Sequence, residues 1–167
     1  MAKSVKKKVK KKSNEIILKA KIIAKGAEIP RYNYESDVGF DLRANENVEI
    51  FPGAQQRVRT GLVFEIPEGY IGIIRDRAGI VEHMGVHCVA GTFDSGFRGE
   101  VSIILVNTAD ETASIEKGMR ICQMIIVPVV KVKITQVEKL SETERGEKSF
   151  GSTGLKELIK LDKKMKH

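Results

Sequence analysis

Cysteine is scarce in this chain of 167 residues, which contains only Cys88 and Cys122. Neither belongs to a Cys-x-x-Cys pair, the spacing that is typical of zinc sites and redox motifs. The two residues therefore form neither a disulfide framework nor a zinc site, and we interpret them as small buried side chains. Free cysteines indicate a reducing compartment, so we expect an intracellular, cytoplasmic protein, with the nucleus as the alternative for a eukaryotic source.

Long apolar runs are missing as well. No stretch approaches the roughly 18 apolar residues of a membrane-spanning helix, so we expect no membrane partner. The opening residues lack the apolar core of a secretory signal, and they lack the arginine and serine of a transit peptide. With 41% hydrophobic and 31% charged residues, the composition is that of one soluble globular domain.

The excess of positive charge lies at the two ends of the chain. The formal net charge is +7, but residues 1–12 contain seven lysines, and residues 155–167 contain five lysines and two acids. The remaining residues, 13–154, hold 17 basic and 20 acidic side chains, a net charge of −3. We therefore expect a basic disordered arm at residues 1–14, for which weak polyanion binding is the alternative role.

Helical periodicity is absent between residues 15 and 140, apart from a short turn at Ala78–Met84. Short runs rich in valine and isoleucine, such as Val101–Asn107, are separated there by glycine, proline and asparagine. This pattern predicts an all-β domain at residues 15–140, built as a jelly-roll-like barrel or sandwich. Residues 155–167 instead space their apolar side chains as a short basic amphipathic helix does.

Residues 145–154 follow the last predicted strand and carry groups that suit a nucleoside triphosphate. The segment reads Arg-Gly-Glu-Lys-Ser-Phe-Gly-Ser-Thr-Gly. A guanidinium binds phosphate oxygens in pairs, glycine leaves backbone N–H groups accessible, and an aromatic ring offers a face to a base. The alternative is a flexible glycine- and serine-rich tail without a site.

Other stretches repeat this chemistry. Asp94 and Phe97 stand between glycines just before a long strand, where a carboxylate can activate water and a ring can wall off a sugar. Arg75–Gly79 directly follows a strand, which aims charged side chains and a glycine N–H at an anion. Gly118–Gln123 opens another strand, and Asp41 lies between apolar residues, an unfavourable place for an unpaired carboxylate. Ordinary turns and surface salt bridges are the alternative for these stretches.

Taken in order, five stretches resemble the five motifs of the trimeric dUTP pyrophosphatases (dUTPases). They are Asp37–Ala44, Arg77–Gly79, Gly91–Gly99, Gly118–Gln123 and Arg145–Gly154. The resemblance extends from about residue 28 to residue 154, some three-quarters of the chain. It implies a jelly-roll-like β subunit of a homotrimer whose active sites are built from all three chains.

The resemblance also implies a reaction, the Mg²⁺-dependent hydrolysis of dUTP to dUMP and pyrophosphate by attack of water on the α-phosphorus. Such an enzyme limits the incorporation of uracil into DNA and supplies dUMP for thymidylate synthesis. Mg²⁺ retains most of its water ligands and needs few carboxylates, so the lack of an acidic cluster fits this cofactor. Asp41 is expected to help order the magnesium shell through water.

By position in the motifs, Asp94 is the expected catalytic carboxylate, and Phe97 is expected to press on the deoxyribose. The other substrate-binding residues fall into three groups. The base is expected beside Cys88, Gly91, Thr92, Phe93 and Ser102. The phosphates are expected at Arg77, Ala78, Gly79 and Gln123. A mobile tail at residues 141–154 is expected to close over the nucleotide through Arg145, Phe150, Gly151, Ser152 and Thr153.

The chain departs from the family at two of these positions. Ala78 occupies the place of a serine whose hydroxyl bonds the phosphate chain, which predicts slower turnover. Phe97 replaces the usual tyrosine but keeps the ring, so the exclusion of a 2′-hydroxyl is expected to survive.

Two other functions stay open on the sequence alone. A dCTP deaminase shares the fold, but that branch carries a catalytic glutamate on the strand after the hairpin, and Val101–Asn107 contains no acid. A regulatory or binding trimer with weak catalysis would use the lysine-rich arms on a polyanion. The three histidines have no serine or cysteine at nucleophile spacing, so we expect no covalent mechanism.

Overall fold

The structure, a computed structural model, describes residues 15–147. The expected arm at 1–14, the extension at 155–167 and the tail residues Phe150, Gly151, Ser152 and Thr153 lie outside the described residues. The described chain divides into two units, the first ending at Lys131 and the second beginning at Val132. All strands of the described chain belong to the first unit.

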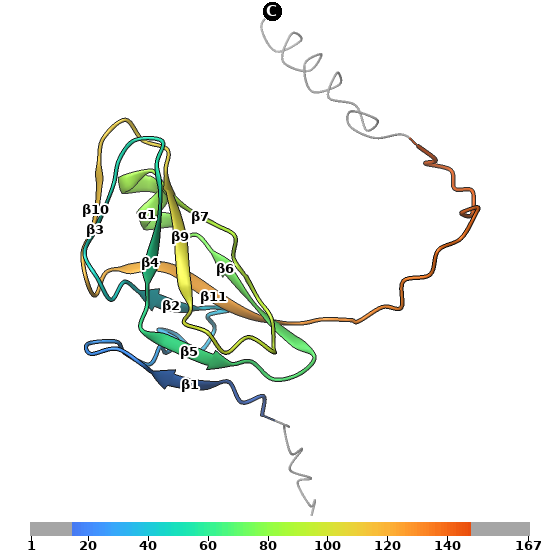
Figure 1. The fold of residues 1–167 in the computed structure, drawn as a ribbon, viewed down its shortest axis with the longest axis horizontal. Coiled ribbons are helices and arrows are strands. Elements are labelled where there is room, and N and C mark those ends of the chain that lie inside the picture. Colours follow the sequence, from blue (N-terminus) through green and yellow to red (C-terminus); the bar gives the residue numbers. More distant parts are fainter. Residues whose placement is uncertain (1–14, 148–167) are drawn as a thin grey trace, which may run out of the picture. The chain divides into compact units, whose positions relative to one another are not determined.

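The regular secondary structure of the first unit is almost entirely β-strand (Figure 1). Within the described residues the elements are β1 (Lys19–Ile22), β2 (Phe40–Arg43), β3 (Val48–Ile50), β4 (Gln55–Arg59), β5 (Leu62–Glu65), β6 (Tyr70–Arg75), α1 (Ala78–Met84), β7 (Val86–Val89), β8 (Thr92–Phe93), β9 (Ser102–Asn107), β10 (Ala113–Ile115) and β11 (Arg120–Pro128). The all-β prediction is confirmed, and α1 occupies the residues of the expected short turn. No helix within residues 15–147 has the length and apolar character needed to cross a membrane.

The strands pair antiparallel in small sheets. A four-stranded sheet has the order β2-β11-β6-β8, and a three-stranded sheet has the order β4-β9-β7 (Figure 1). Two further pairs, β1 with β5 and β10 with β3, complete the arrangement. Because β11 lies between β2 and β6, Gln123 is the register partner of both Asp41 and Arg75. Sheet pairing therefore gathers side chains from three distant segments at one place.

The core is built from one face of each sheet. On β9, Ile103 and Leu105 are buried, whereas Ile104 and Val106 on the opposite face are only half-buried. This alternation is the pleat of a strand that packs one face inward. The apolar second face of β9 is thus only partly covered within a single chain.

The two cysteines differ in their surroundings. Cys122 on β11 is fully buried, and Cys88 on β7 is half-buried. The neighbouring Cys88 thiol and, after it, burial raise the pKa of Cys122 well above its usual range. Cys122 is therefore a neutral core thiol, in agreement with its interpretation as a small buried side chain.

Helix α1 matters to the site through its first turn. The helix begins after Arg77 and ends at Gly85, whose φ of 61° is the left-handed conformation that favours glycine. Only Ile80 of this helix is buried, so it anchors the element to the core. Ala78 and Gly79, which directly precede that anchor, are exposed.

Candidate active site

Five of the residues predicted from the sequence come together around one hollow of about 330 Å³. They are Asp41, Arg77, Ala78, Gly79 and Gln123. Ala78 and Gly79 open α1, Arg77 directly precedes the helix, and β2 and β11 contribute one residue each. We call these five residues the phosphate-side cluster, because guanidinium, amide and glycine N–H groups are donors that suit phosphate oxygens.

Gly79 has no structural reason to be glycine. Its φ is not positive, and a Cβ added to it would meet nothing within 4 Å. Gly39, across the same hollow, differs, because its Cβ would come within 3.0 Å of the Met124 carbonyl oxygen. The absence of a side chain at Gly79 therefore leaves its backbone accessible at the hollow without serving the fold.

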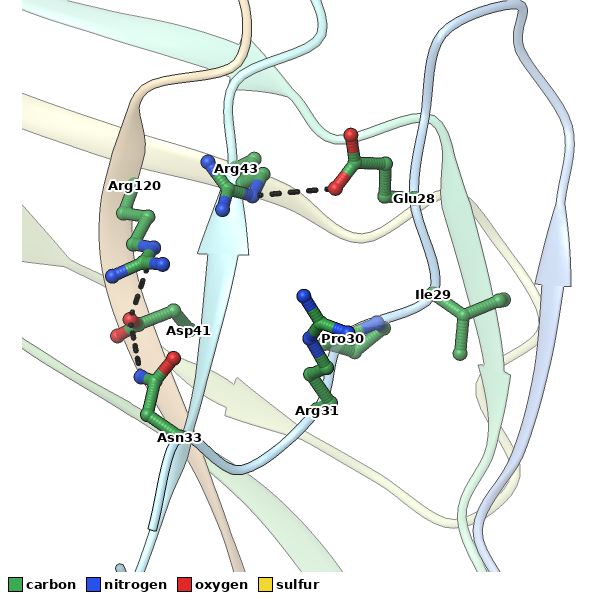
Figure 2. Close-up of a pocket in the computed structure, with 8 residues that line it drawn as sticks. All are labelled: Glu28, Ile29, Pro30, Arg31, Asn33, Asp41, Arg43 and Arg120. Atoms are coloured by element: carbon green, nitrogen blue, oxygen red, sulfur yellow. Dashed lines mark hydrogen bonds and ion pairs between the residues drawn. The ribbon is translucent and has the colours of Figure 1, made fainter.

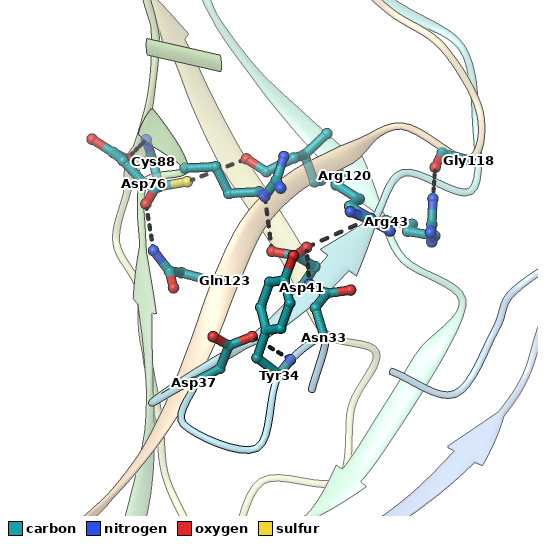
Figure 3. A network of polar contacts seen from close by, with 12 residues as sticks. Asn33, Tyr34, Asp37, Asp41, Arg43, Asp76, Cys88, Gly118, Arg120 and Gln123 are labelled. Atoms are coloured by element: carbon teal, nitrogen blue, oxygen red, sulfur yellow. Dashed lines mark hydrogen bonds and ion pairs between the residues drawn. The ribbon is translucent and has the colours of Figure 1, made fainter. Parts of the chain in front are cut away.

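Asp41 lies between two guanidinium groups (Figure 3). Its Oδ1 accepts a hydrogen bond from Nε of Arg77 at 2.8 Å, and its Oδ2 is 3.5 Å from Nε of Arg120. Nδ2 of Asn33 also donates to Oδ2, at 3.2 Å, and the side chain of Asp41 is only 14% exposed. These contacts explain how a carboxylate is accommodated between apolar neighbours. Since Arg77 uses Nε here, its two terminal nitrogens are not consumed by this bond.

A second hollow, of only about 40 Å³, lies on the other side of Asp41 (Figure 2). Three arginines line it, but two of them are already engaged. Arg43 donates to the Gly118 carbonyl oxygen at 2.6 Å and lies 3.6 Å from Glu28, while Arg120 faces Asp41. The volume suits a water molecule or two rather than a phosphate group, so we assign this hollow a structural role.

Asp76 joins three segments through short hydrogen bonds (Figure 3). Its Oδ1 accepts from the N–H of Cys88 at 2.7 Å, and its Oδ2 is 3.0 Å from Nδ1 of His87. Its main-chain oxygen accepts from Nε2 of Gln123 at 3.0 Å. Partial burial raises the pKa of Asp76, but the bonds from Cys88 and His87 outweigh burial and lower it below the usual range. The contact between Asp76 and His87 was not predicted, because nothing in the spacing of these residues signals it.

A separate hollow of about 260 Å³ holds the base-side residues. Four of the predicted site residues line it, Thr92, Phe93, Phe97 and Ser102, and Arg57, Ala90, Glu100 and Ile104 line it as well. The rings of Phe93 and Phe97 are 5.9 Å apart, and Phe97 remains 42% exposed. An aromatic ring that is exposed at the edge of a hollow is available to a ligand.

Gly91 lets the chain turn closely against β6. A Cβ at this position would come within 2.7 Å of the Cβ of Ile74. Its carbonyl oxygen accepts a hydrogen bond from the N–H of Ile74 at 2.7 Å. The preceding residue, Ala90, has a φ of 56°, which is uncommon for a residue that carries a side chain. We call Ala90–Gly91 the base-side corner, because the chain passes there from β7 to β8.

Asp94 stands at the exposed end of the same segment. Its main-chain oxygen accepts from the N–H of Phe97 at 3.1 Å, which closes the turn that carries the ring. Within residues 15–147 its carboxylate takes part in no hydrogen bond or ion pair, and the residue is exposed. The carboxylate is therefore accessible to water.

The other predicted site residues have different outcomes. Cys88 is held in the Asp76 network instead of lining the base-side hollow. Arg145 is exposed and belongs to the second unit. Phe150, Gly151, Ser152 and Thr153 lie outside the described residues.

The described side chains form no preassembled metal centre. Residues 15–147 contain no group of three or more histidine, cysteine, aspartate or glutamate side chains that could hold a metal ion. A magnesium ion bound chiefly by substrate phosphates and water does not need such a group. The accessible carboxylate of Asp94 and the donors of the phosphate-side cluster fit an ion held in that way.

Comparison with known proteins gives consistent results. The model of the dUTPase family matches residues 25–154. The deoxyuridine 5′-triphosphate nucleotidohydrolase of Clostridium tetani is 43% identical over 142 residues, which are 84% of this chain and 98% of that protein. The enzyme of the same name from Brucella melitensis biotype 2 is 44% identical over 137 residues, covering 78% of this chain and 87% of the relative.

Solved structures agree with the fold. The dUTPase of Staphylococcus bacteriophage 80alpha, solved with dUPNHPP, superposes with a TM-score of 0.78 at 30% identity. The match covers 83% of this chain and 99% of that one. A mutant dUTPase of phage phi11 of S. aureus, described with a structural Mg(II) ion, gives a TM-score of 0.69 at 25% identity, covering 74% and 97% of the two chains.

Proposed function

This chain belongs to the dUTPase family, and on that premise we propose that it hydrolyses dUTP to dUMP and pyrophosphate with Mg²⁺. Water attacks the α-phosphorus in this reaction, so no covalent intermediate is formed on the protein. The strongest support from the geometry is the gathering of Arg77, Gly79 and Gln123 at one open hollow. Their donors suit the polyphosphate, which carries about four negative charges that must be neutralised before water can approach.

The phosphate-side cluster binds and orients the polyphosphate. Arg77 offers its terminal nitrogens while Asp41 holds its Nε. Gln123 is fixed through Nε2 by the main-chain oxygen of Asp76, so its amide orientation is set before substrate arrives. Ala78 contributes no hydrogen bond from its side chain.

Asp94 orients and activates the attacking water as a general base. Its carboxylate is exposed and engages no other described side chain, so it is available to accept a proton. Phe97 presses its ring on the deoxyribose, where a 2′-hydroxyl would collide with it. Thr92, Phe93, Ser102 and the base-side corner surround the uracil, with Cys88 supporting them from β7.

Mg²⁺ supplies charge neutralisation and polarises the phosphate oxygens when it is bound. The chain contributes Asp41 near the metal shell, through water, and leaves the direct ligands to the nucleotide. Because Asp41 is already paired with Arg77 and Arg120, its contribution to the metal is indirect.

Assembly as a homotrimer completes the site. Within one chain the phosphate-side cluster and the base-side residues line different hollows, which supports an active site composed of more than one copy. Apolar side chains that one chain leaves uncovered supply surfaces for association. Val130 is 88% exposed and Ile134 is 91% exposed, and the outer face of β9 is only half-covered.

Residues 141–154 form the tail that closes over the bound nucleotide, with Arg145 as its phosphate ligand and Phe150 on the base. Closure of such a segment excludes water and strengthens the contacts inside. The β domain at residues 15–140 is then the scaffold, and the reaction limits uracil in DNA while it supplies dUMP for thymidylate synthesis.

Pyrophosphate release from dUTP, dTTP, dCTP and UTP, with and without Mg²⁺, tests this function. We expect rapid release from dUTP alone, and only with the metal present. Release of ammonia from dCTP would assign the chain to the deaminase branch of the fold. Absence of pyrophosphate release from all four nucleotides, together with heparin retention that requires residues 1–12, would favour a binding protein.

A further inference from the structure

Asp76 lies where the two larger sheets meet. It directly follows β6, a strand of the four-stranded sheet, and its main-chain oxygen is bonded to Gln123 of β11 in the same sheet. Its carboxylate instead reaches β7, the end strand of the three-stranded sheet. One residue therefore ties the end of one sheet to the edge of the other.

The contact with β7 replaces a missing strand partner. Because β7 is the end strand, N–H groups on its outer edge have no neighbouring strand to accept their hydrogen bonds. Oδ1 of Asp76 accepts the N–H of Cys88 at 2.7 Å, and Oδ2 lies 3.0 Å from His87 Nδ1. Two successive residues of β7 are thus held by one carboxylate.

This contact matters because β7 leads directly into the base-side corner and β8. Only the base-side corner separates β7 from β8, whose Thr92 and Phe93 line the base-side hollow. Ala90 in that corner has a left-handed backbone, a conformation that persists only where its surroundings hold it. The Asp76 carboxylate fastens the strand two residues before this strained position.

The other side of Asp76 faces the phosphate-side cluster. Arg77 is the next residue in the chain, and the Asp76 carbonyl oxygen holds the Gln123 amide. The lowered pKa of Asp76 keeps its carboxylate ionised at neutral pH, so the attachment to β7 is continuously present.

We propose that Asp76 is a positioning residue that fixes the base-side corner relative to Arg77 and Gln123, and thereby sets the preference for uracil over other pyrimidines. The proposal rests on dUTP hydrolysis as the function of this site. Groups that recognise a base discriminate only when they are held within a fraction of an ångström. Loosening β7 is therefore expected to blur base recognition more than it slows the reaction of the correct substrate.

The experiment compares full-length wild type with Asp76→Ala, Asp76→Asn and His87→Ala. Asp110→Ala, an exposed carboxylate outside this network, is the matched control. For each protein, kcat/KM is measured by pyrophosphate release from dUTP and dCTP, and the inhibition constant of dCTP replaces its kcat/KM where turnover is too slow. Thermal unfolding reports stability in parallel.

We expect Asp76→Ala to lower the dUTP-to-dCTP ratio about tenfold, the usual size of one charged hydrogen bond. Asp76→Asn keeps an oxygen for the Cys88 N–H and is expected to retain most of the ratio, as is His87→Ala. Asp110→Ala should leave it unchanged. If Asp76 had a purely structural role, Asp76→Ala would lower kcat/KM for dUTP and for dCTP by the same factor. An unchanged dUTP-to-dCTP ratio in that variant therefore overturns the proposal. If wild type fails to hydrolyse dUTP, the proposed function fails instead.

Discussion

Nε of Arg77 donates a hydrogen bond to Oδ1 of Asp41 at 2.8 Å, so the guanidinium expected at the phosphates is anchored by a carboxylate expected near the metal. The pairing changes what Asp41 can contribute. A carboxylate between two guanidinium groups acts first through them and only secondarily on a hydrated metal ion.

Asp41→Asn should therefore lower stability and weaken substrate binding, while the magnesium requirement stays the same. The change removes the negative charge between Arg77 and Arg120, at a side chain that is only 14% exposed. We expect a loss of about 2 kcal/mol, or about 4–8 °C in Tm for a protein of this size, and a higher KM for dUTP. Calorimetry and magnesium titrations of activity measure these effects.

Glu28→Gln is the control for that substitution. Glu28 lies 3.6 Å from Arg43, but its side chain is 72% exposed, and exposed pairs contribute little. We expect no measurable change in Tm or KM. A lower KM in Asp41→Asn would show that removing negative charge outweighs the loss of the anchor, and an increased magnesium requirement would restore the direct metal role.

Ala78→Ser should raise kcat. Ala78 is exposed in the phosphate-side hollow, and a hydroxyl there would donate to an oxygen of the polyphosphate. A hydrogen bond to a charged group is worth about 1.5–3 kcal/mol, so a gain of about tenfold or more is expected if the bond forms in the transition state. Steady-state kinetics with dUTP decide the matter, and an unchanged kcat would mean that the hydroxyl is dispensable in this chain.

Gly79→Ala and Gly91→Ala should separate function from fold. A Cβ on Gly79 meets nothing within 4 Å, and alanine favours a helix, so stability should hold or rise by about 0.5 kcal/mol while KM for dUTP rises. A Cβ on Gly91 would meet Ile74 at 2.7 Å, so that variant should lose about 1–3 kcal/mol. Thermal unfolding and KM are measured on both. Equal Tm losses in the two variants would contradict this division.

The Asp76 carboxylate should add pH-dependent stability. Its pKa is lowered in the folded protein, so the contribution is present above the pKa of the unfolded chain, about 3.9, and disappears as pH falls through the folded value. The Tm difference between wild type and Asp76→Asn should therefore be larger at pH 7 than near pH 3. Glu65 serves as the comparison, because its pKa is lowered by the exposed Lys19. High salt should weaken the contribution of Glu65 to stability but not that of Asp76. A pH-independent difference for Asp76→Asn would contradict the assignment.

The sequence contained enough to predict the class of fold and the members of the phosphate-side cluster. Alternating apolar runs specify strands by local chemistry, and the glycine-flanked motifs mark where strands end. Gln123 and Arg77 were recognised one motif at a time, but only the β2-β11-β6 pairing explains why they share a hollow.

The contacts among side chains could not be predicted in the same way. Asp76 and His87 meet because β7 lies beside the end of β6, and such long-range contacts leave no periodic signal. The left-handed backbone of Ala90 could not be predicted, because its φ depends on the corner between two sheets and not on the preference of alanine. Arg57 lines the base-side hollow but was not predicted, because it lies on β4, a strand in which no motif was recognised.

The most direct test of the central claim is pyrophosphate release from dUTP with Mg²⁺ by wild type and by Asp94→Asn. Asparagine keeps the shape of the side chain but cannot accept a proton, and a general base contributes about 10²- to 10⁴-fold to a rate. We predict a loss of kcat in that range with Tm unchanged, because the carboxylate is exposed and engages no other described side chain. A variant that hydrolyses dUTP as fast as wild type would contradict the assignment of Asp94 and the mechanism built on it.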